Sequence, residues 1–209
     1  NFNHLTGDIN DKNKLGKYVK TCNPDFVFHL AAQSLVMKSY IEPINTWYVN
    51  VIGSLNVLEA LKDLNKNCSV VMVTTDKVYS NCEWIYSYRE NDELGGHDPY
   101  SASKAAMEIA ISSWIKSFCG TGDNQTPYLS IATARAGNVI GGGDWARNRI
   151  IPDSIRALKN KQQIMVRNPN AIRPWQHVLD PLSGYIRLAE YLSNNHLDIN
   201  RQKKRLPTA

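Results

Sequence analysis

The 209-residue chain lacks the features that mark membrane, repetitive and disordered proteins. No apolar run approaches the roughly 18 residues that a membrane-spanning helix needs, so we expect no membrane association. The sequence holds no internal repeat and no low-complexity segment. With 43% hydrophobic and 21% charged residues, the composition is that of a globular protein with a sizeable core.

Cysteine is scarce, and its spacing is uninformative. The four cysteines form no CxxC motif, and no histidine lies at metal-ligand spacing from them, so we expect no metal site: Cys22, Cys68, Cys82 and Cys119. We expect these cysteines to be reduced and mostly packed in the core of a cytoplasmic protein.

Positive charge is dispersed, although the net charge is +5. The only dense basic run covers residues 201–205, and a solvated tail is the simplest interpretation of it. A nucleic-acid-binding face would combine basic and aromatic residues, so we expect no nucleic-acid partner.

Short apolar runs alternate with segments of helical spacing. Residues 25–30, 69–75 and 128–134 are typical of buried strands, whereas residues 44–64 and 100–118 have helical periodicity. Strands separated by helices of this length predict βαβ units, and therefore an α/β fold with a doubly wound parallel sheet.

Candidate site residues follow each expected strand. Ligands of open parallel sheets bind beyond the carboxyl ends of the strands, so residues 29–33, 74–79 and 135–138 are expected to line one crevice.

After Gly143 the loops become long and rich in proline, tryptophan and arginine, with short helices near residues 152–159 and 181–192. We therefore expect a partial sheet domain over residues 1–140. Part of a smaller lobe, interleaved with the first, is expected over residues 141–209.

The sharpest chemical pattern is YSASK at residues 100–104. Residues four apart on a helix share a face, with Cβ atoms roughly 5–6 Å apart. A lysine cation at that position favours phenolate, so we expect Lys104 to lower the pKa of Tyr100. Such a phenolate accepts a proton from a hydroxyl group near neutral pH. The bare pattern is common on helix surfaces, but the Asp98-Pro99 pair before it and the nearby strand end at residues 74–76 strengthen a functional interpretation.

Four strings together resemble the extended short-chain dehydrogenase/reductase family, which comprises the NAD-dependent epimerases and dehydratases. They are HLAA at residues 29–32, TTDKVY at residues 74–79, YSASK at residues 100–104 and RAGN at residues 135–138. The resemblance extends from Gly7 to about Leu192. It implies a Rossmann-like fold, with NAD bound by residues 1–140 and a nucleotide sugar covered by the smaller lobe.

Further strings resemble the branch of that family that dehydrates CDP-glucose: TDK at residues 75–77, EWIY at 83–86, GGGDW at 141–145 and IRPWQH at 172–177. In the branch that acts on dTDP-glucose the third residue of the triplet is glutamate, and epimerases usually lack both acids. The resemblance implies a lyase that forms a 4-keto-6-deoxy sugar on a deoxysugar route toward polysaccharide.

The resemblance also implies a division of labour among the catalytic residues. Tyr100 removes the proton of the sugar C4 hydroxyl, and Thr75 hydrogen-bonds the same hydroxyl. Lys77 removes the C5 proton, and Asp76 protonates the departing C6 hydroxyl. An ordinary lysine is charged at pH 7, so Lys77 needs a lowered pKa, which a desolvated crevice and the neighbouring Lys104 would supply.

The cofactor and substrate contacts are likewise implied by resemblance. The expected NAD-binding residues are Asp8, Ile9, Leu30, Ala31, Ala32, Gln33, Asn50, Thr75, Tyr100, Lys104 and Ala136. The expected substrate-binding residues are Asn138, Trp145, Arg149, Ile150, Arg173, Gln176 and His177. Arg173 is the best candidate for the diphosphate, because a planar guanidinium binds phosphate oxygens bidentately. Asn50 and His177 also admit purely structural interpretations.

The chain departs from the family at both ends. It contains no GxxGxxG turn, which in the family brings a helix N-terminus against the pyrophosphate, and residues 200–209 do not resemble the family. We therefore expect a fragment that begins at the third strand of the sheet and that on its own binds NAD weakly or not at all.

Relatives pair through two long helices, which implies a homodimer through residues 44–64 and 100–118. Two alternatives stay open: a 4-epimerase or dTDP-glucose dehydratase on the same fold, and a non-catalytic NAD-binding protein. The last would need none of the acid–base residues.

Overall fold

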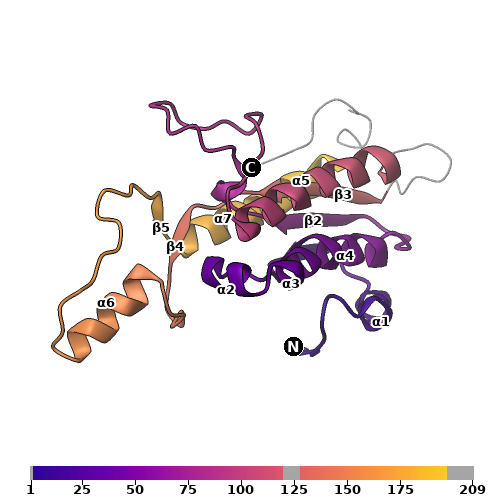
Figure 1. Cartoon of the computed structure of the whole chain (residues 1–209). Helices are drawn as coiled ribbons and strands as arrows, with labels where there is room; N and C mark the ends of the chain where they lie inside the picture. Colours follow the sequence, from indigo (N-terminus) through magenta and orange to yellow (C-terminus); the bar gives the residue numbers. More distant parts are fainter. Residues whose placement is uncertain (1, 120–127, 197–209) are drawn as a thin grey trace.

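A computed structural model describes residues 2–119 and 128–196 of the protein. Its main sheet has three parallel strands in the order β1 (Phe26–His29), β2 (Cys68–Val73) and β3 (Leu129–Ala134) (Figure 1). All three expected strands are present, and the α/β class with a parallel sheet is confirmed.

Helices cover both faces of this sheet, as a doubly wound fold requires. On one face α4 (Gly53–Leu61) and α5 (Pro99–Phe118) pack against Val70 and Met72 of β2. On the other face α7 (Leu179–Asn194) packs against Val71 of β2 and the alanines of β3. Successive side chains of a strand point to opposite faces, so the central strand contributes to two separate hydrophobic cores.

The long helix expected over residues 44–64 is not one α-helix. It consists of α3 (Pro43–Trp47), the π-helical turn η1 (Tyr48–Ile52) and α4, and it follows the short helix α2 (Val36–Ile41). The wider turn coincides with a fully buried Asn50, whose amide hydrogen-bonds groups outside its own helix. Single π-turns of this kind are frequent at functional sites.

The expectation that the chain begins at a strand is wrong for the described residues. Residues 2–8 form no strand, and the first regular element is α1 (Lys12–Cys22), which packs against α4. The Asp11 side chain caps α1 by accepting a hydrogen bond from the Lys14 N–H, and Asn23 closes it in the left-handed conformation. Strand geometry needs a paired neighbour, and within the described residues β1 is paired on one edge only.

Beyond β3 the chain leaves the sheet and then returns to it. β4 (Asn138–Ile140) pairs in parallel with β5 (Trp175–His177), and between them α6 (Ile150–Lys159) and the loop that follows it project away from the sheet (Figure 1). Both short helices expected in this part are present, each beginning two residues earlier than predicted. Because α7 covers one face of the sheet, the last described helix belongs to the same core as the strands.

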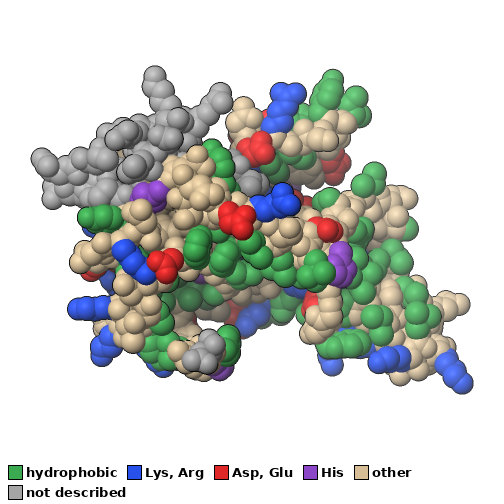
Figure 2. Space-filling model, turned by 180° about the vertical axis from the view of Figure 1, so that it is seen from behind, with side chains coloured by type: hydrophobic (Ala, Val, Ile, Leu, Met, Phe, Trp, Pro, Cys, Tyr) green, Lys and Arg blue, Asp and Glu red, His purple; other side chains and the backbone are tan. Residues whose placement is uncertain are grey.

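Apolar side chains gather on the face that carries α7, as the view from behind shows (Figure 2). Phe26 and Phe28 point to this face from β1 and are 47% and 39% exposed, because α7 packs against β2 and β3. Among residues 2–119 and 128–196, no helix is long and apolar enough to cross a membrane.

The cysteines only partly follow the expectation that they pack. Cys68 is buried in β2 and Cys119 is half-buried, whereas Cys22 and Cys82 are exposed. The basic run at residues 201–205 lies outside the described residues.

The two-sided core predicts a clear stability difference between two leucines. Leu58 is fully buried in α4, so Leu58→Ala should lower the free energy of unfolding by about 2–5 kcal/mol through lost burial and a cavity. Leu158 on α6 is 63% exposed, and Leu158→Ala should change it by less than about 0.5 kcal/mol. Equal effects in urea unfolding would contradict this assignment of the core.

Candidate active site

The first turn of α5 is fixed by its cap. The Asp98 carboxylate accepts hydrogen bonds from the backbone N–H groups of Tyr100 and Ser101, both at 3.0 Å, and Ser101 reciprocates in a capping box. Just before it, Gly96 has a φ of 138°, and a Cβ there would lie 2.4 Å from the Ala102 nitrogen, so only glycine fits. These local constraints hold Tyr100 at the start of the helix.

The segment after β2 turns sharply into the 3₁₀ helix η2 (Asp76–Val78), which Thr75 caps. The Asp76 N–H donates to the Ala136 carbonyl at 3.0 Å, which ties the end of β2 to the end of β3. Lys77 Nζ lies 3.2 Å from Asp76 Oδ1 and 3.1 Å from Asn138 Oδ1. The structure thus brings together three predicted side chains from the ends of two strands.

Tyr100 faces this turn and is 8% exposed. Burial raises the pKa of its phenol, and the negative charges of Asp76 and Asp98 raise it further. A hydrogen bond from Thr75 and the positive charge of Arg149 act in the opposite direction. The expectation that the pKa of Tyr100 is lowered is therefore wrong, because desolvation is the largest effect on it.

Lys104 lies one turn further along α5 and is 3% exposed. Its ammonium group donates to the carbonyl of Val73 at 3.2 Å, at the end of β2. Burial lowers the pKa of Lys104 to about 8, and the carboxylate of Glu108 opposes that change. In this arrangement the lysine is anchored to the strand.

Sequence reasoning missed a buried ion pair between Glu108 and Arg135, whose side chains are 5% and 7% exposed. Thr74 Oγ1 also donates to Glu108 Oε1 at 2.5 Å. The spacing offered a signal, since Glu108 follows Lys104 by four residues and therefore shares its helical face.

Asn50 and Gln33 hold the turn after β1 in place. Asn50 Oδ1 accepts from the Gln33 N–H at 2.9 Å, and Asn50 Nδ2 donates to Ser103 Oγ at 2.8 Å. Gln33 Nε2 donates to Thr46 Oγ1 at 2.9 Å. Both amides are thus engaged within the protein, which favours the structural interpretation of Asn50.

The other expected cofactor residues fall into two groups. Leu30 and Ala31 are exposed and Ala32 is half-buried at the end of β1, while Ala136 is half-buried at the end of β3. Asp8 and Ile9 form the second group and lie just before α1, near the N-terminus. Asp8 is exposed and accepts from the Asn10 N–H at 2.8 Å, and the side chain of Ile9 packs against Gly53.

The loop after β4 supplies the next group of predicted substrate residues. Arg149 Nη1 lies 2.5 Å from Asp144 Oδ2, and its charge acts on Tyr100, which is consistent with a position beside the site. Trp145 is 53% exposed, with Lys159 Nζ 5.3 Å from its ring centre, and Ile150 begins α6.

The segment at residues 172–177 runs beside β4 through the β4–β5 pairing. Arg173 is exposed and donates to the Ile172 carbonyl at 2.7 Å, and Gln176 pairs opposite Val139. The His177 ring accepts from the Leu179 N–H at 3.3 Å, which supports a structural role at the start of α7.

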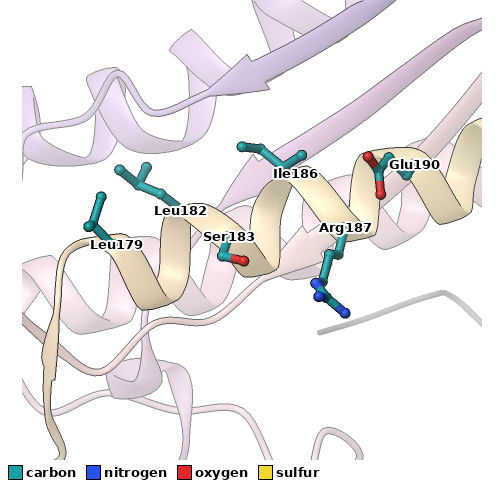
Figure 3. Close-up of a pocket in the computed structure, with 6 residues that line it drawn as sticks. All are labelled: Leu179, Leu182, Ser183, Ile186, Arg187 and Glu190. Atoms are coloured by element: carbon teal, nitrogen blue, oxygen red, sulfur yellow. The ribbon is translucent and has the colours of Figure 1, made fainter.

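A surface groove of about 780 Å³ runs along α7 (Figure 3). Leu179, Leu182 and Ile186 point to one side of the helix, and Arg187 points to the opposite side. No predicted site residue lines this groove. We place the candidate active site at the carboxyl ends of β1–β3, because the acidic, basic and phenolic side chains converge there.

A parallel sheet with proton-transfer groups at its carboxyl edge defines a class of ligand-binding α/β proteins. The model of the NAD dependent epimerase/dehydratase family matches residues 2–200, and the chain belongs to that family. NAD is accordingly its cofactor.

Three relatives illustrate the range of the family. The chain is 49% identical over 186 residues to a CDP-glucose 4,6-dehydratase of Salmonella typhimurium, covering 89% of this chain and 52% of the relative. It is 27% identical to a UDP-glucose 4-epimerase of Mycoplasma pneumoniae, covering 88% and 56%. The structure of UDP-N-acetylglucosamine 4-epimerase from Methanobrevibacter ruminantium superposes with a TM-score of 0.73 at 26% identity, covering 89% and 57%. The chain therefore spans about half the length of the curated relatives it matches.

The buried histidine beneath the site predicts a pH dependence of stability. His29 is 5% exposed, and its Nε2 lies 2.9 Å from Ser54 Oγ. Burial, aided by the charge of Lys104, lowers the pKa of His29 from 6.5 to about 4. The unfolded chain binds this proton first, so stability is full above pH 6.5 and about 3 kcal/mol is lost as the pH falls to about 4.

Urea unfolding between pH 7 and pH 4 tests this effect. His29→Gln should reduce the loss of unfolding free energy between pH 7 and pH 4 relative to the natural protein. His97→Gln, at an exposed position, should leave that loss unchanged. Identical slopes for all three proteins would show that His29 does not titrate in this way.

Proposed function

We propose that the protein to which these residues belong is a CDP-glucose 4,6-dehydratase, which converts CDP-glucose to CDP-4-keto-6-deoxyglucose. The 49% identity to the Salmonella enzyme over 89% of the chain supports this substrate. The dehydration chemistry rests on one observation in the site, the contact of Lys77 Nζ with Asp76 Oδ1 at 3.2 Å in a turn that faces Tyr100.

A dehydration needs a base for one carbon and an acid for the leaving hydroxyl. In our proposal Lys77 takes the C5 proton, and Asp76 gives a proton to the C6 hydroxyl, which leaves as water. Asn138 accepts a hydrogen bond from Lys77 at 3.1 Å and would keep the lysine directed at the sugar. The side chains of Lys77 and Asp76 are 37% and 28% exposed, so both can reach a bound ligand.

The elimination requires an acidic C5 proton, and the first step supplies it by oxidising C4 to a ketone. Tyr100 accepts the proton of the C4 hydroxyl, and Thr75, which hydrogen-bonds the phenol, orients the same hydroxyl. Bound NAD would supply a hydride acceptor for C4, and the same hydride would then be available for C6, so that the net redox change would be zero. Because burial raises the pKa of Tyr100, forming the phenolate depends on positive charge nearby, which Arg149 and a reoriented Lys104 would supply.

The residues at the strand ends fit this cofactor. The exposed Leu30 and Ala31 leave the end of β1 open to a flat ligand, and the rigid Gln33–Asn50 contact fixes the backbone beside it. Lys104 carries ammonium hydrogens suited to a ribose hydroxyl, and it lies on the helix that presents Tyr100.

The test is an assay of the whole protein with NAD and CDP-glucose, which detects the 4-keto-6-deoxy product by its absorbance in alkali. dTDP-, UDP- and GDP-glucose are run in parallel. Tyr100→Phe should lower kcat at least about 100-fold by removing the proton acceptor, and Lys77→Ala should lower it sharply. Tyr191→Phe, on the exposed side of α7, is the matched control and should keep full activity.

Each outcome has a definite meaning. Product from another nucleotide sugar would keep the chemistry and reject CDP-glucose. Epimerised sugar without keto product would support a 4-epimerase, the activity named for several relatives. NAD binding without any turnover would support the non-catalytic alternative.

We also propose that the protein forms a homodimer through α3, η1 and α5. Ile44, Tyr48 and Ile52 form a stripe at helical spacing that is 78%, 52% and 39% exposed, and Ile109 on α5 is 60% exposed. Several exposed apolar side chains on packed helices are typical of an interface.

Substitution in this stripe tests the assembly. Ile44→Glu should shift the protein toward monomer, because a charge would be buried in the interface. Ile172→Glu, at a position 91% exposed outside the stripe, should leave the oligomeric state unchanged. Analytical ultracentrifugation across a concentration series measures both, and a monomeric natural protein would reject the proposal.

A further inference from the structure

The ion pair between Glu108 and Arg135 lies at the junction of four chain segments. Glu108 comes from α5, two helical turns after Tyr100 and one after Lys104. Arg135 comes from the end of β3, immediately before Ala136, whose carbonyl accepts from the Asp76 N–H. The pair therefore connects the helix that carries Tyr100 with the strand ends that carry the Thr75–Lys77 turn.

Glu108 uses both carboxylate oxygens. Oε1 accepts from Thr74 Oγ1 at 2.5 Å and from Arg135 Nε at 2.8 Å, while Oε2 accepts from Arg135 Nη2. Thr74 immediately precedes Thr75, so one carboxylate fixes both strand ends against the helix. A bidentate contact of this kind restrains orientation as well as distance.

The same guanidinium holds the loop above the site. Arg135 Nη1 donates to the Glu90 carbonyl at 3.1 Å, and its guanidinium carbon lies 4.7 Å from the centre of the Tyr79 ring. Tyr79 stacks on Tyr88 at 4.8 Å between ring centres. The hydrogen bonds of the pair thus join α5, the ends of β2 and β3, and the loop that contains Glu90.

Stability alone does not account for such a pair. Taking two charges out of water costs several kcal/mol per ion, and apolar replacements of similar volume are often as stable or more so. A buried ion pair with several directed hydrogen bonds does impose one arrangement on the groups that it joins.

We propose that Glu108, through Arg135 and Thr74, is a positioning residue that sets the separation between Tyr100 and the Thr75–Lys77 turn. This inference rests on the proposed dehydratase function. Glu108 itself touches no reacting atom. It acts by holding the proton acceptor of the first step and the acid–base pair of the second at one fixed geometry.

Glu108 also places a negative charge on the helical face that it shares with Lys104, and this charge acts on the lysine. The groups that face Lys104 are His29 from β1, the Val73 carbonyl from β2, and Met107 Sδ and Glu108 from α5 itself. Of these, the Glu108 carboxylate is the one that raises the pKa of Lys104, against the effect of burial.

A pair of variants separates positioning from simple stabilisation. Glu108→Gln leaves the buried Arg135 cation without its counter-ion and should destabilise the protein strongly. The double variant Glu108→Gln/Arg135→Met removes both charges and should unfold near the natural midpoint. If Glu108 positions the site, the double variant should still show kcat at least about tenfold lower, with little change in KM.

The matched control is the double variant Glu190→Gln/Arg187→Met, which removes two exposed charges from α7 and should change neither quantity. A folded Glu108→Gln/Arg135→Met protein with natural kcat would overturn the proposal. So would a rise in KM with unchanged kcat, because that result would indicate weaker ligand binding with an intact reaction geometry.

A second measurement does not depend on turnover. The pKa of Lys104, read by NMR from its ¹³Cε resonance and assigned with Lys104→Arg, should move below about 8 in Glu108→Gln. Turnover gives a separate check. The alkaline limb of the pH profile of kcat should move to lower pH in Glu108→Gln, because Lys104 loses its ammonium proton at a lower pH. An unchanged Lys104 titration would contradict the coupling.

The two hypotheses fail in different ways. No keto product from the natural protein, together with a shifted Lys104 titration, would reject the dehydratase and keep the link between Glu108 and Lys104. Normal product from both the natural protein and the folded double variant would keep the dehydratase and reject the positioning role.

Discussion

β2 is hydrogen-bonded to a parallel neighbour along both edges, and helices cover both of its faces. Because all three strands run in the same direction, the turns that follow them open at one edge of the sheet. The backbone bond between Asp76 and Ala136 then fixes two of those turns to each other. The candidate active site depends on this parallel pairing, since its side chains come from segments far apart in the sequence.

Much of this arrangement could be predicted from the sequence. The β-branched run at residues 69–75 indicates a buried strand, and the YSASK string at residues 100–104 indicates a catalytic helix. The alternation of strands with helices predicts that the strands run in parallel. The convergence of the strand ends needed no further information. Strand bounds differ from the expected ones by at most two residues at either end.

The rest depends on contacts that periodicity does not contain. The π-turn at Tyr48–Ile52 exists because Asn50 bonds Gln33 and Ser103, which are distant in the sequence. The raised pKa of Tyr100 depends on how deeply its ring is buried, whereas the spacing of a lysine four residues away suggests the opposite sign. The bond of Lys104 to the Val73 carbonyl is equally invisible in the sequence, because it joins a helix to a strand.

The loop between Tyr79 and Leu94 is closed at its base by backbone contacts. Ser80 donates to the Glu93 carbonyl at 2.8 Å, Gly95 donates to the Val78 carbonyl at 2.7 Å, and Tyr79 and Leu94 form a bridge. These contacts hold the two ends of the loop side by side. The length of the loop between them therefore has little effect on the geometry of the strand ends. Doubling such a loop costs only about 0.6 kcal/mol of closure entropy. In evolutionary terms, the protein can lengthen, shorten or replace residues 83–87 at little cost in folding free energy, while the strand ends that carry the candidate active site keep their geometry.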